Sequence, residues 1–513
     1  MSLFYFAKDI IPYQRRRVNE VEKRHDEALR APIAEAMKAY AADGARAYHT
    51  PGHKQGLGAH PLLKALVTEE GLREEVSLME ELDDLHEPTM CIKEAQEMAA
   101  ALYGADQAFF MINGTTGAIH TMLMGALAPG DTVLVPRNAH RSVIGGIILA
   151  GARLVFLQPE IDESLGIAMG LTEETVRSAI AAHPEAKALV CVYPTYYGVT
   201  YSLAEIAELV HAHGMLLLVD EAHGPHLRFS DDLPPQAIDC GADMAAQSTH
   251  KILGAMTQAS MLLTSGPRVS RERVREAASL LQSTSPNQLL LASLDIARLQ
   301  MAEDGRETVG RAVRLAEKLR RAINEIDGLW SFGPEYTDYP GATGLDTTKL
   351  TVQVTGLGLS GVEAESILRH EYKVQCELSD ARNLLFILSY ADGKEQADYL
   401  LAALQGLARD HRRATVAASA VAAELPAVPA QGMTPREAFF APKCSVPFGE
   451  AEGRIAAEQV MFYPPGIPIL CPGDIIDAAS LHYIRAMQSL GLKVVGPRDA
   501  SLTELQVVGR GEQ

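Results

Sequence analysis

The chain has 513 residues, of which 47% are apolar and 22% are charged, and this composition excludes fibrous and disordered proteins. The length exceeds what one hydrophobic core usually organises and predicts two or three domains. The 46 basic and 65 acidic residues give a net charge of −19, which opposes binding to nucleic acid or to an anionic membrane surface. A negative field would favour a cationic small molecule, although solubility alone explains such a charge.

The six cysteines are scattered along the chain without a CxxC pair, which disfavours both a disulfide framework and a zinc cluster. We therefore expect no metal site. Near the N-terminus an apolar stretch precedes the basic residues 15–17, the reverse of the order in a secretory signal. No uncharged apolar run approaches the roughly 20 residues that cross a bilayer. These features together predict a cytoplasmic protein without a membrane partner.

The chain begins with a charged, helix-compatible stretch, which predicts an N-terminal helical arm over residues 1–45. Short apolar runs then recur, separated mostly by segments long enough for a crossover helix. These runs cover residues 108–112, 132–135, 154–157, 188–192, 216–219, 244–246 and 260–263. Because they lack alternation, they indicate strands that are buried on both faces. We expect an α/β fold with a mainly parallel sheet in a large domain over residues 46–330.

The second half of the chain changes in pattern. Strand-like stretches at residues 349–354, 373–377 and 384–388 lie among amphipathic segments and predict a smaller α+β domain over residues 331–415. An Ala-, Val- and Pro-rich stretch then predicts a linker. Residues 416–513 are therefore expected to form this linker and a C-terminal domain.

A loop of small residues, Asn113-Gly114-Thr115-Thr116-Gly117, follows the first predicted strand and precedes a helix-like segment. Backbone N–H groups, threonine hydroxyls and a helix N-terminus can together bind an anion such as a phosphate. The loop matches neither the Walker sequence nor the GxGxxG fingerprint, and a plain strand-to-helix turn is the alternative.

Asp220 ends a predicted buried strand and begins the sequence Asp220-Glu221-Ala222-His223. A buried carboxylate needs a partner, and a protonated pyridine nitrogen would provide one. An ordinary ion pair or a helix cap is the alternative.

Lys251 ends the sequence Ser248-Thr249-His250-Lys251, directly after another predicted strand. A lysine in apolar surroundings can have a lowered pKa and form an imine, whereas an isolated lysine is usually a solvated surface group.

His140 follows the predicted strand at residues 132–135. Its imidazole could stack on an aromatic cofactor or transfer a proton, and a structural loop histidine is the alternative. The order of phosphate loop, ring partner, acidic strand end and lysine is far more specific than any one of these residues.

With these motifs the sequence resembles the Orn/Lys/Arg decarboxylase family over most of its length. Members of that family are fold type I pyridoxal 5′-phosphate (PLP) enzymes of aspartate-aminotransferase-like architecture. The resemblance is carried by His49-Thr50-Pro51-Gly52-His53-Lys54, Leu82-Asp83-Asp84-Leu85-His86, Asn113-Gly114-Thr115-Thr116, Arg137-Asn138-Ala139-His140, Asp220-Glu221-Ala222-His223-Gly224, Ser248-Thr249-His250-Lys251 and Tyr463-Pro464-Pro465-Gly466-Ile467-Pro468. The chain is similar to the short form, without the receiver-like domain of the long inducible decarboxylases.

The resemblance implies a role for each of these site residues. Lys251 would carry PLP through an imine, Asp220 would pair with the pyridine nitrogen, and His140 would stack on the ring. The phosphate would be held by Thr115, Thr116, Ser248 and His250, and Gly114 of the same loop would also bind the cofactor. His223 stands where longer relatives have Trp, and it would contact the phenolic oxygen of the cofactor.

The short-form resemblance favours decarboxylation of L-arginine to agmatine, with lysine to cadaverine and ornithine to putrescine as competitors. An aminotransferase or aldolase would share Lys251 and Asp220 but would usually need an arginine for the α-carboxylate. An inactive regulatory homologue would be expected to lack one of these two residues, and both are present.

Glu377 and Asp380 follow a strand-like stretch and are expected to bind the distal cation of the substrate, the alternative being a cap or a surface ion pair. The family also implies at least a homodimer with its active sites near the interface. His53, Lys54 and the substrate candidate Asp84 could then serve the neighbouring site, or be ordinary loop and cap residues.

Overall fold

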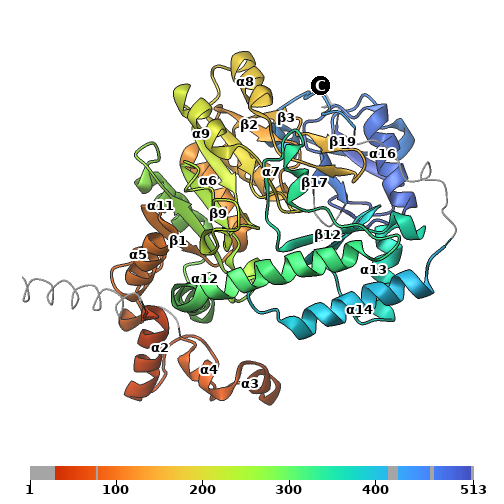
Figure 1. The fold of residues 1–513 in the computed structure, drawn as a ribbon. Helices are drawn as coiled ribbons and strands as arrows, with labels where there is room; N and C mark the ends of the chain where they lie inside the picture. Colours follow the sequence, from red (N-terminus) through yellow and green to blue (C-terminus); the bar gives the residue numbers. More distant parts are fainter. Residues whose placement is uncertain (1–28, 77–78, 414–425, 463–466, 510–513) are drawn as a thin grey trace, which may run out of the picture.

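The computed structural model describes residues 29–76, 79–413, 426–462 and 467–509. Its centre is a seven-stranded sheet (Figure 1). In spatial order the strands are β1 (Gln107–Met111), β10 (Ser260–Thr264), β9 (Met244–Gln247), β8 (Leu216–Asp220), β6 (Ala188–Val192), β2 (Thr132–Pro136) and β3 (Arg153–Leu157). The strands from β9 to β3 are parallel, and β10 runs antiparallel to both of its neighbours. The expected α/β fold with a mainly parallel sheet is confirmed.

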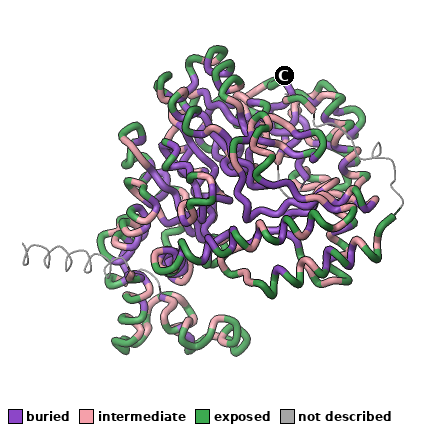
Figure 2. The backbone as a smooth tube through the Cα atoms, in the orientation of Figure 1, coloured by how far each residue is buried: buried purple, intermediate pink, exposed green. Residues whose placement is uncertain are grey.

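Successive residues of a strand point to opposite faces of the sheet. Because the strands are largely apolar, both faces must be covered, and helices cover each of them. In β2, Leu134 packs into one core, whereas Val133 and Val135 pack into the other. The helices on the Leu134 face are α5 (Cys91–Tyr103), α8 (Glu173–Ala182), α9 (Leu203–Ala212) and the first half of α12 (Gln288–Asn324). The opposite face is covered by α6 (Gly114–Ala126), α7 (Arg141–Ala150) and α11 (Arg271–Leu281). Figure 2 shows the buried strands between exposed outer helices.

A third hydrophobic core forms around the C-terminal half of α12. It contains an antiparallel sheet of β12 (Lys349–Gln353), β14 (Asn383–Ile387) and β13 (Leu378–Ser379), together with α13 (Gly361–His370) and α14 (Lys394–Asp410). The predicted strand at residues 373–377 is wrong. Lys373 has a left-handed backbone with φ of 57°, and Val374 donates back to the Leu368 carbonyl, so the chain turns there instead of extending.

The C-terminal residues form a separate core. It is built from β15 (Lys443–Pro447) paired with β19 (Glu504–Val508), from β16 (Val460–Phe462), β17 (Ile467–Leu470) and β18 (Val494–Val495), and from α16 (Ala478–Ser489). A buried ion pair ties this unit to the large sheet, because Arg137 after β2 contacts Asp474 at 2.9 Å. Residues 463–466 of the motif noted in the sequence lie outside the described residues. No helix in the described ranges has the length and apolar character needed to cross a membrane.

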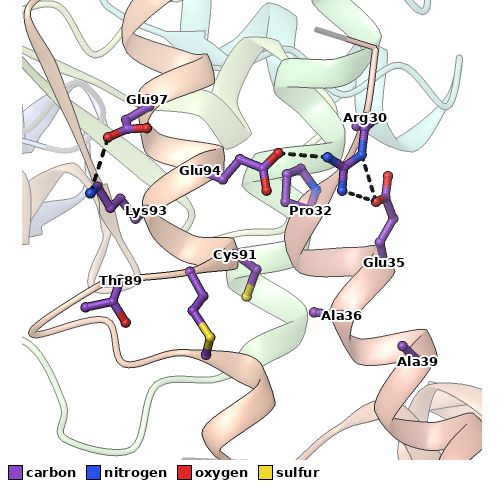
Figure 3. Close-up of a pocket in the computed structure, with 11 residues that line it drawn as sticks. Arg30, Pro32, Glu35, Ala36, Ala39, Thr89, Cys91, Lys93, Glu94 and Glu97 are labelled. Atoms are coloured by element: carbon purple, nitrogen blue, oxygen red, sulfur yellow. Dashed lines mark hydrogen bonds and ion pairs between the residues drawn. The ribbon is translucent and has the colours of Figure 1, made fainter. Parts of the chain in front are cut away.

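The N-terminal segment projects from the main body in Figure 1. It contains α2 (Pro32–Asp43), α3 (Pro61–Val67) and α4 (Glu69–Glu74), while residues 1–28 of the predicted arm lie outside the described residues. The buried pair Asp295 and Arg298 on α12 anchors α2, since Asp295 accepts from the Ile33 amide and Arg298 donates to the Arg30 carbonyl. Figure 3 shows the shallow hollow between α2 and α5, where the Arg30 guanidinium bridges Glu35 and Glu94.

Candidate active site

A cavity of about 760 Å³ lies where the strands of the large sheet end. Ligands of open parallel sheets bind at this edge. All nine residues that the sequence assigned to the cofactor line the cavity, namely Gly114, Thr115, Thr116, His140, Asp220, His223, Ser248, His250 and Lys251. They come from four different strand ends, so the fold brings together residues that are separated by as many as 137 positions, from 114 to 251.

Lys251, on the short helix α10 (Thr249–Ile252), directs its amine into the cavity. The Nζ atom lies 3.0 Å from His223 Nε2 and 5.7 Å from the centre of the Tyr196 ring. Burial lowers the pKa of Lys251, while the charges of Asp220 and Glu377 oppose this effect. Burial and the charge of Lys251 also lower the pKa of His223 far below its ordinary value. The Lys251 amine and the His223 imidazole therefore lie in direct contact, and each has a pKa below its ordinary value.

Asp220 ends β8 and is almost completely buried, with 4% of its surface exposed. Its carboxylate accepts from the Ala222 amide at 3.2 Å. Burial raises the pKa of Asp220, and Lys251 is the charge that opposes this. Because a buried carboxylate is costly without a cation, the site suits a positively charged group placed against Asp220. This observation fits a protonated pyridine ring.

His140 is the N-cap of α7 and has a fixed orientation. Its Nδ1 atom accepts from the Ser142 amide and lies 2.8 Å from the Ser142 hydroxyl, which places the remaining proton of the neutral ring on Nε2. Burial lowers the pKa of His140 to about 4, with Lys251 and Arg141 adding to the effect. A neutral, flat side chain on the cavity wall is suited to stacking on an aromatic ring.

The small-residue loop provides an anion site at the start of α6. Gly114 has φ of 67°, a left-handed conformation that favours glycine, and it lets the chain turn directly into the helix. The first-turn amides of a helix lack intrahelical partners and can bind a phosphate. The Thr115 hydroxyl contacts Ser260 Oγ at 3.0 Å, and Ser260 in turn donates to the Gln247 carbonyl. Thr115 therefore gives its proton to the sheet, and the Thr116 hydroxyl is the better phosphate donor.

Ser248 and His250 line the same end of the cavity. The Nδ1 atom of His250 donates to the Ala259 carbonyl at 2.9 Å and lies 3.3 Å from Ser248 Oγ. These bonds orient the imidazole, and they are compatible with the expected phosphate contact.

The three substrate candidates lie in different places. Glu377 is exposed and does not itself line the cavity, but it accepts from the hydroxyl of the lining residue Tyr196 at 2.7 Å, and its charge acts on Lys251. Asp380 lines the cavity, but its carboxylate accepts from the Tyr197 hydroxyl and from the amides of residues 382 and 383, so it organises a turn. Asp84 is exposed and caps the His86 amide away from the cavity of its own chain.

Sequence reasoning missed several residues of the cavity wall. Tyr196 packs against His223 with the ring centres 4.3 Å apart and the ring planes inclined by 50°, and its hydroxyl contacts Glu377. The hairpin of β4 (Ile161–Asp162) and β5 (Ile167–Ala168) forms one side, and Phe462, Tyr483 and Met487 of the C-terminal unit form another. Tyr196 also follows a buried strand, β6, and this position is a signal that could have identified it.

The burial of Glu221, next to Asp220, predicts how the stability of the protein depends on pH. Glu221 is completely buried, accepts from the Gln247 amide and the Ala237 amide, and burial raises its pKa to about 8. The unfolded chain loses this proton near pH 4.3 and the folded chain retains it, so the contribution to stability falls as pH rises from about 4.3 toward 8. The Glu221→Gln variant should not lose this stability. Its free energy of unfolding should therefore rise relative to that of the parent by up to about 1.4 kcal/mol for each pH unit in that window.

Thermal unfolding of parent and Glu221→Gln between pH 5 and 8.5 measures this difference, with the exposed Glu208→Gln as control. The variant should gain stability over the parent as pH rises. A constant difference across this range would contradict the raised pKa of Glu221.

Comparison with known proteins decides the family. The model of the Orn/Lys/Arg decarboxylase major domain matches residues 31–396, and that of the C-terminal domain matches residues 418–497. The chain belongs to the Orn/Lys/Arg decarboxylase family. It is 44% identical over 481 residues to an arginine decarboxylase of Halalkalibacterium halodurans, covering 94% of this chain and 98% of the relative. A lysine decarboxylase of Pseudomonas aeruginosa is 26% identical, covering 92% of this chain and 77% of the relative.

The solved structure of lysine decarboxylase A from Pseudomonas aeruginosa is similar in fold, with a TM-score of 0.80. The sequences are 24% identical, and the match covers 98% of this chain and 84% of that chain. As a member of this family the chain is a PLP-dependent amino-acid decarboxylase, and the expectations of family, enzyme class and fold type are confirmed.

Proposed function

We propose that this decarboxylase converts L-arginine to agmatine and CO₂ with PLP bound to Lys251. The observation that carries the proposal is the contact of the Lys251 amine with His223 inside the cavity that Asp220 also lines. The choice of arginine is supported by the 44% identity to an arginine decarboxylase over nearly the whole chain, against 26% for a lysine decarboxylase.

The residues present fit PLP. Thr116, Ser248, His250 and the first amides of α6 would hold its phosphate, His140 would lie against its ring, and Asp220 would pair with its nitrogen. PLP bound in this way would accept the electron pair that remains when the bond between Cα and the carboxylate breaks.

The protein's own residues would then manage protons and water. Lys251 is poised to bind the cofactor because its lowered pKa increases the fraction of neutral amine. His223 Nε2 and Lys251 Nζ lie within hydrogen-bond distance of each other, and one of these two atoms would deliver the proton to the substrate Cα. The side chains of Phe462 and Met487 line the cavity and would limit the access of water to this carbon.

The two arginines of the cavity favour decarboxylation over transamination. Arg137 is paired with Asp474 and also donates to the Ile469 carbonyl, and Arg382 donates to the carbonyls of residues 163 and 164. Both are committed to protein acceptors, whereas an aminotransferase usually needs an arginine for the α-carboxylate. Incubation with arginine should release CO₂ and one equivalent of agmatine, while an oxo acid as the main product would contradict the proposal.

Glu377 is the proposed partner of the substrate guanidinium. Its carboxylate is fixed by Tyr196 on one oxygen, and the other oxygen can accept from the substrate. Glu377→Gln should raise KM for arginine by about tenfold or more and change the affinity for PLP much less.

Steady-state kinetics and cofactor titration separate these two effects. The matched control is Glu395→Gln, an exposed residue at the start of α14, which should leave both quantities unchanged. Equal KM values for the parent and Glu377→Gln would eliminate Glu377 as the specificity carboxylate.

The active form is proposed to be a homodimer. His53 pairs with Glu75, Lys54 donates to the His49 carbonyl, and neither residue lines the cavity of its own chain. Close by, the apolar side chains of Tyr48, Leu57, Leu62 and Leu66 are between 71% and 90% exposed. A second copy would cover this surface and bring His53, Lys54 and Asp84 toward the neighbouring site. A light-scattering mass of one chain under assay conditions would contradict this.

A further inference from the structure

A completely buried ion pair lies directly behind the proposed catalytic residues. Lys349, the first residue of β12, contacts Asp346 with Nζ and Oδ2 2.6 Å apart, and neither side chain has any exposed surface. Burying two charges costs free energy that their attraction often does not repay, so such a pair is weak evidence for a gain in stability. Its neighbours indicate a different role.

Asp346 is saturated with donors. Its Oδ1 atom accepts from the Thr348 hydroxyl at 2.6 Å and from the Thr348 amide at 3.1 Å, and its Oδ2 atom contacts His226 Nε2 at 3.1 Å. Although burial alone would raise the pKa of Asp346, Lys349 and His226 hold it well below its ordinary value. The carboxylate is therefore ionised, and it clamps the end of the turn that runs from Asp220 to His226.

Lys349 holds the middle of the same turn. Its Nζ atom donates to the backbone carbonyl of His223 at 3.4 Å, while the His223 ring contacts Lys251 on its other side. The Lys349 stem also packs against the neighbouring turn, because a Cβ at Gly198 would lie 2.9 Å from its Cβ and Cγ atoms. Asp346 donates its amide to the Gly198 carbonyl. The pair thus contacts the two turns that carry His223 and Tyr196.

We propose that Lys349 and Asp346 are positioning residues, which fix the His223 and Tyr196 turns around Lys251. The inference rests on the proposed function, since it assigns this pair to the same site. Both side chains are completely buried and neither lines the cavity, so neither is expected to touch the substrate.

The electrostatics agree with this geometry. The charged and titratable groups that act on Lys251 or His223 are Asp220, Glu377, Lys349, Asp346 and His140. Burial is the largest cause that lowers the pKa of Lys251 and of His223, and the charge of Lys349 lowers both pKa values further. Asp346 raises the pKa of His223 and so opposes Lys349 there. Removal of the pair should therefore raise the pKa of Lys251.

The test measures this pKa without relying on catalysis. The double variant Lys349→Met, Asp346→Asn leaves no unpaired charge, and the full chain freed of PLP is labelled with acetic anhydride at a series of pH values. Mass spectrometry then gives the labelling midpoint of Lys251. We expect the midpoint to rise by about half a pH unit or more relative to the parent. In the holoenzyme the pH midpoint of the visible cofactor absorbance should move in the same direction.

The structure offers a matched control in Asp295 and Arg298, a buried pair with the same sequence spacing, at 2.7 Å. Arg298→Met, Asp295→Asn should not move the midpoint of Lys251. Lys349→Gln is a second variant, which keeps a hydrogen-bond donor for the His223 carbonyl but removes the positive charge. If the double variant fails to fold, the labelling midpoint of Lys251 in Lys349→Gln tests the proposal instead. An unchanged midpoint in a folded variant, or an equal shift in the control pair, would overturn the proposal. The labelling needs no substrate, so its result is independent of whether arginine is decarboxylated.

Discussion

Lys251→Ala should abolish decarboxylation while the protein remains folded. The side chain lines the cavity and is not buried in the protein interior, so thermal unfolding should change little. The loss of the amine would remove both the proposed attachment of the cofactor and one of the two proposed proton donors, and the rate should fall by about 10⁴-fold or more. The measurement is agmatine formation from arginine at saturating PLP.

The exposed Lys187→Ala serves as control and should retain parental activity. Borohydride reduction of the parent should attach the cofactor to the peptide that contains Lys251 and to no other. Activity of Lys251→Ala within tenfold of the parent would refute the assignment.

Asp220→Asn should reduce kcat by about 100-fold or more and weaken PLP binding. The substitution keeps the acceptor for the Ala222 amide but removes the negative charge at the end of β8. A protonated ring nitrogen would then lose its partner in a site with only 4% of the residue exposed, where screening by water is small. Cofactor titration and single-turnover rates measure the two effects.

The surface variant Asp232→Asn should change neither the affinity for PLP nor the rate. Parental kinetics in Asp220→Asn would mean that another group holds the ring nitrogen.

The large domain could be predicted because its strands are short apolar runs buried on both faces. All seven runs became strands of the central sheet within one or two residues of the expected ends. The nine cofactor residues also converge, since residues that follow parallel strands meet at one edge of a sheet. Local sequence is sufficient to predict which residues lie at this edge, because each motif follows a strand closely in the chain.

The small domain was harder to predict. The stretch at residues 373–377 alternates polar and apolar side chains as a strand would, yet the left-handed turn at Lys373 and the end of α13 determine its path. Pairing with β14 begins only at Leu378. Tertiary contacts override local propensity in such a short segment.

The missed parts of the site depend on contacts between distant segments. Asp346 and Lys349 lie about 100 positions after the site residues that they support, and nothing in their local sequence indicates a partner. Similarly, Tyr483 and Met487 reach the cavity because Arg137 and Asp474 attach the C-terminal unit to the sheet. Spacing along the chain carries no information about such long-range packing.

The central claim, arginine decarboxylation, is tested most directly by kcat/KM for L-arginine, L-lysine and L-ornithine, measured on the same holoenzyme with the amine products identified by mass spectrometry. The account predicts that arginine has the highest kcat/KM and yields agmatine and CO₂ in equal amounts. A higher kcat/KM for cadaverine formation from lysine or putrescine formation from ornithine would contradict it.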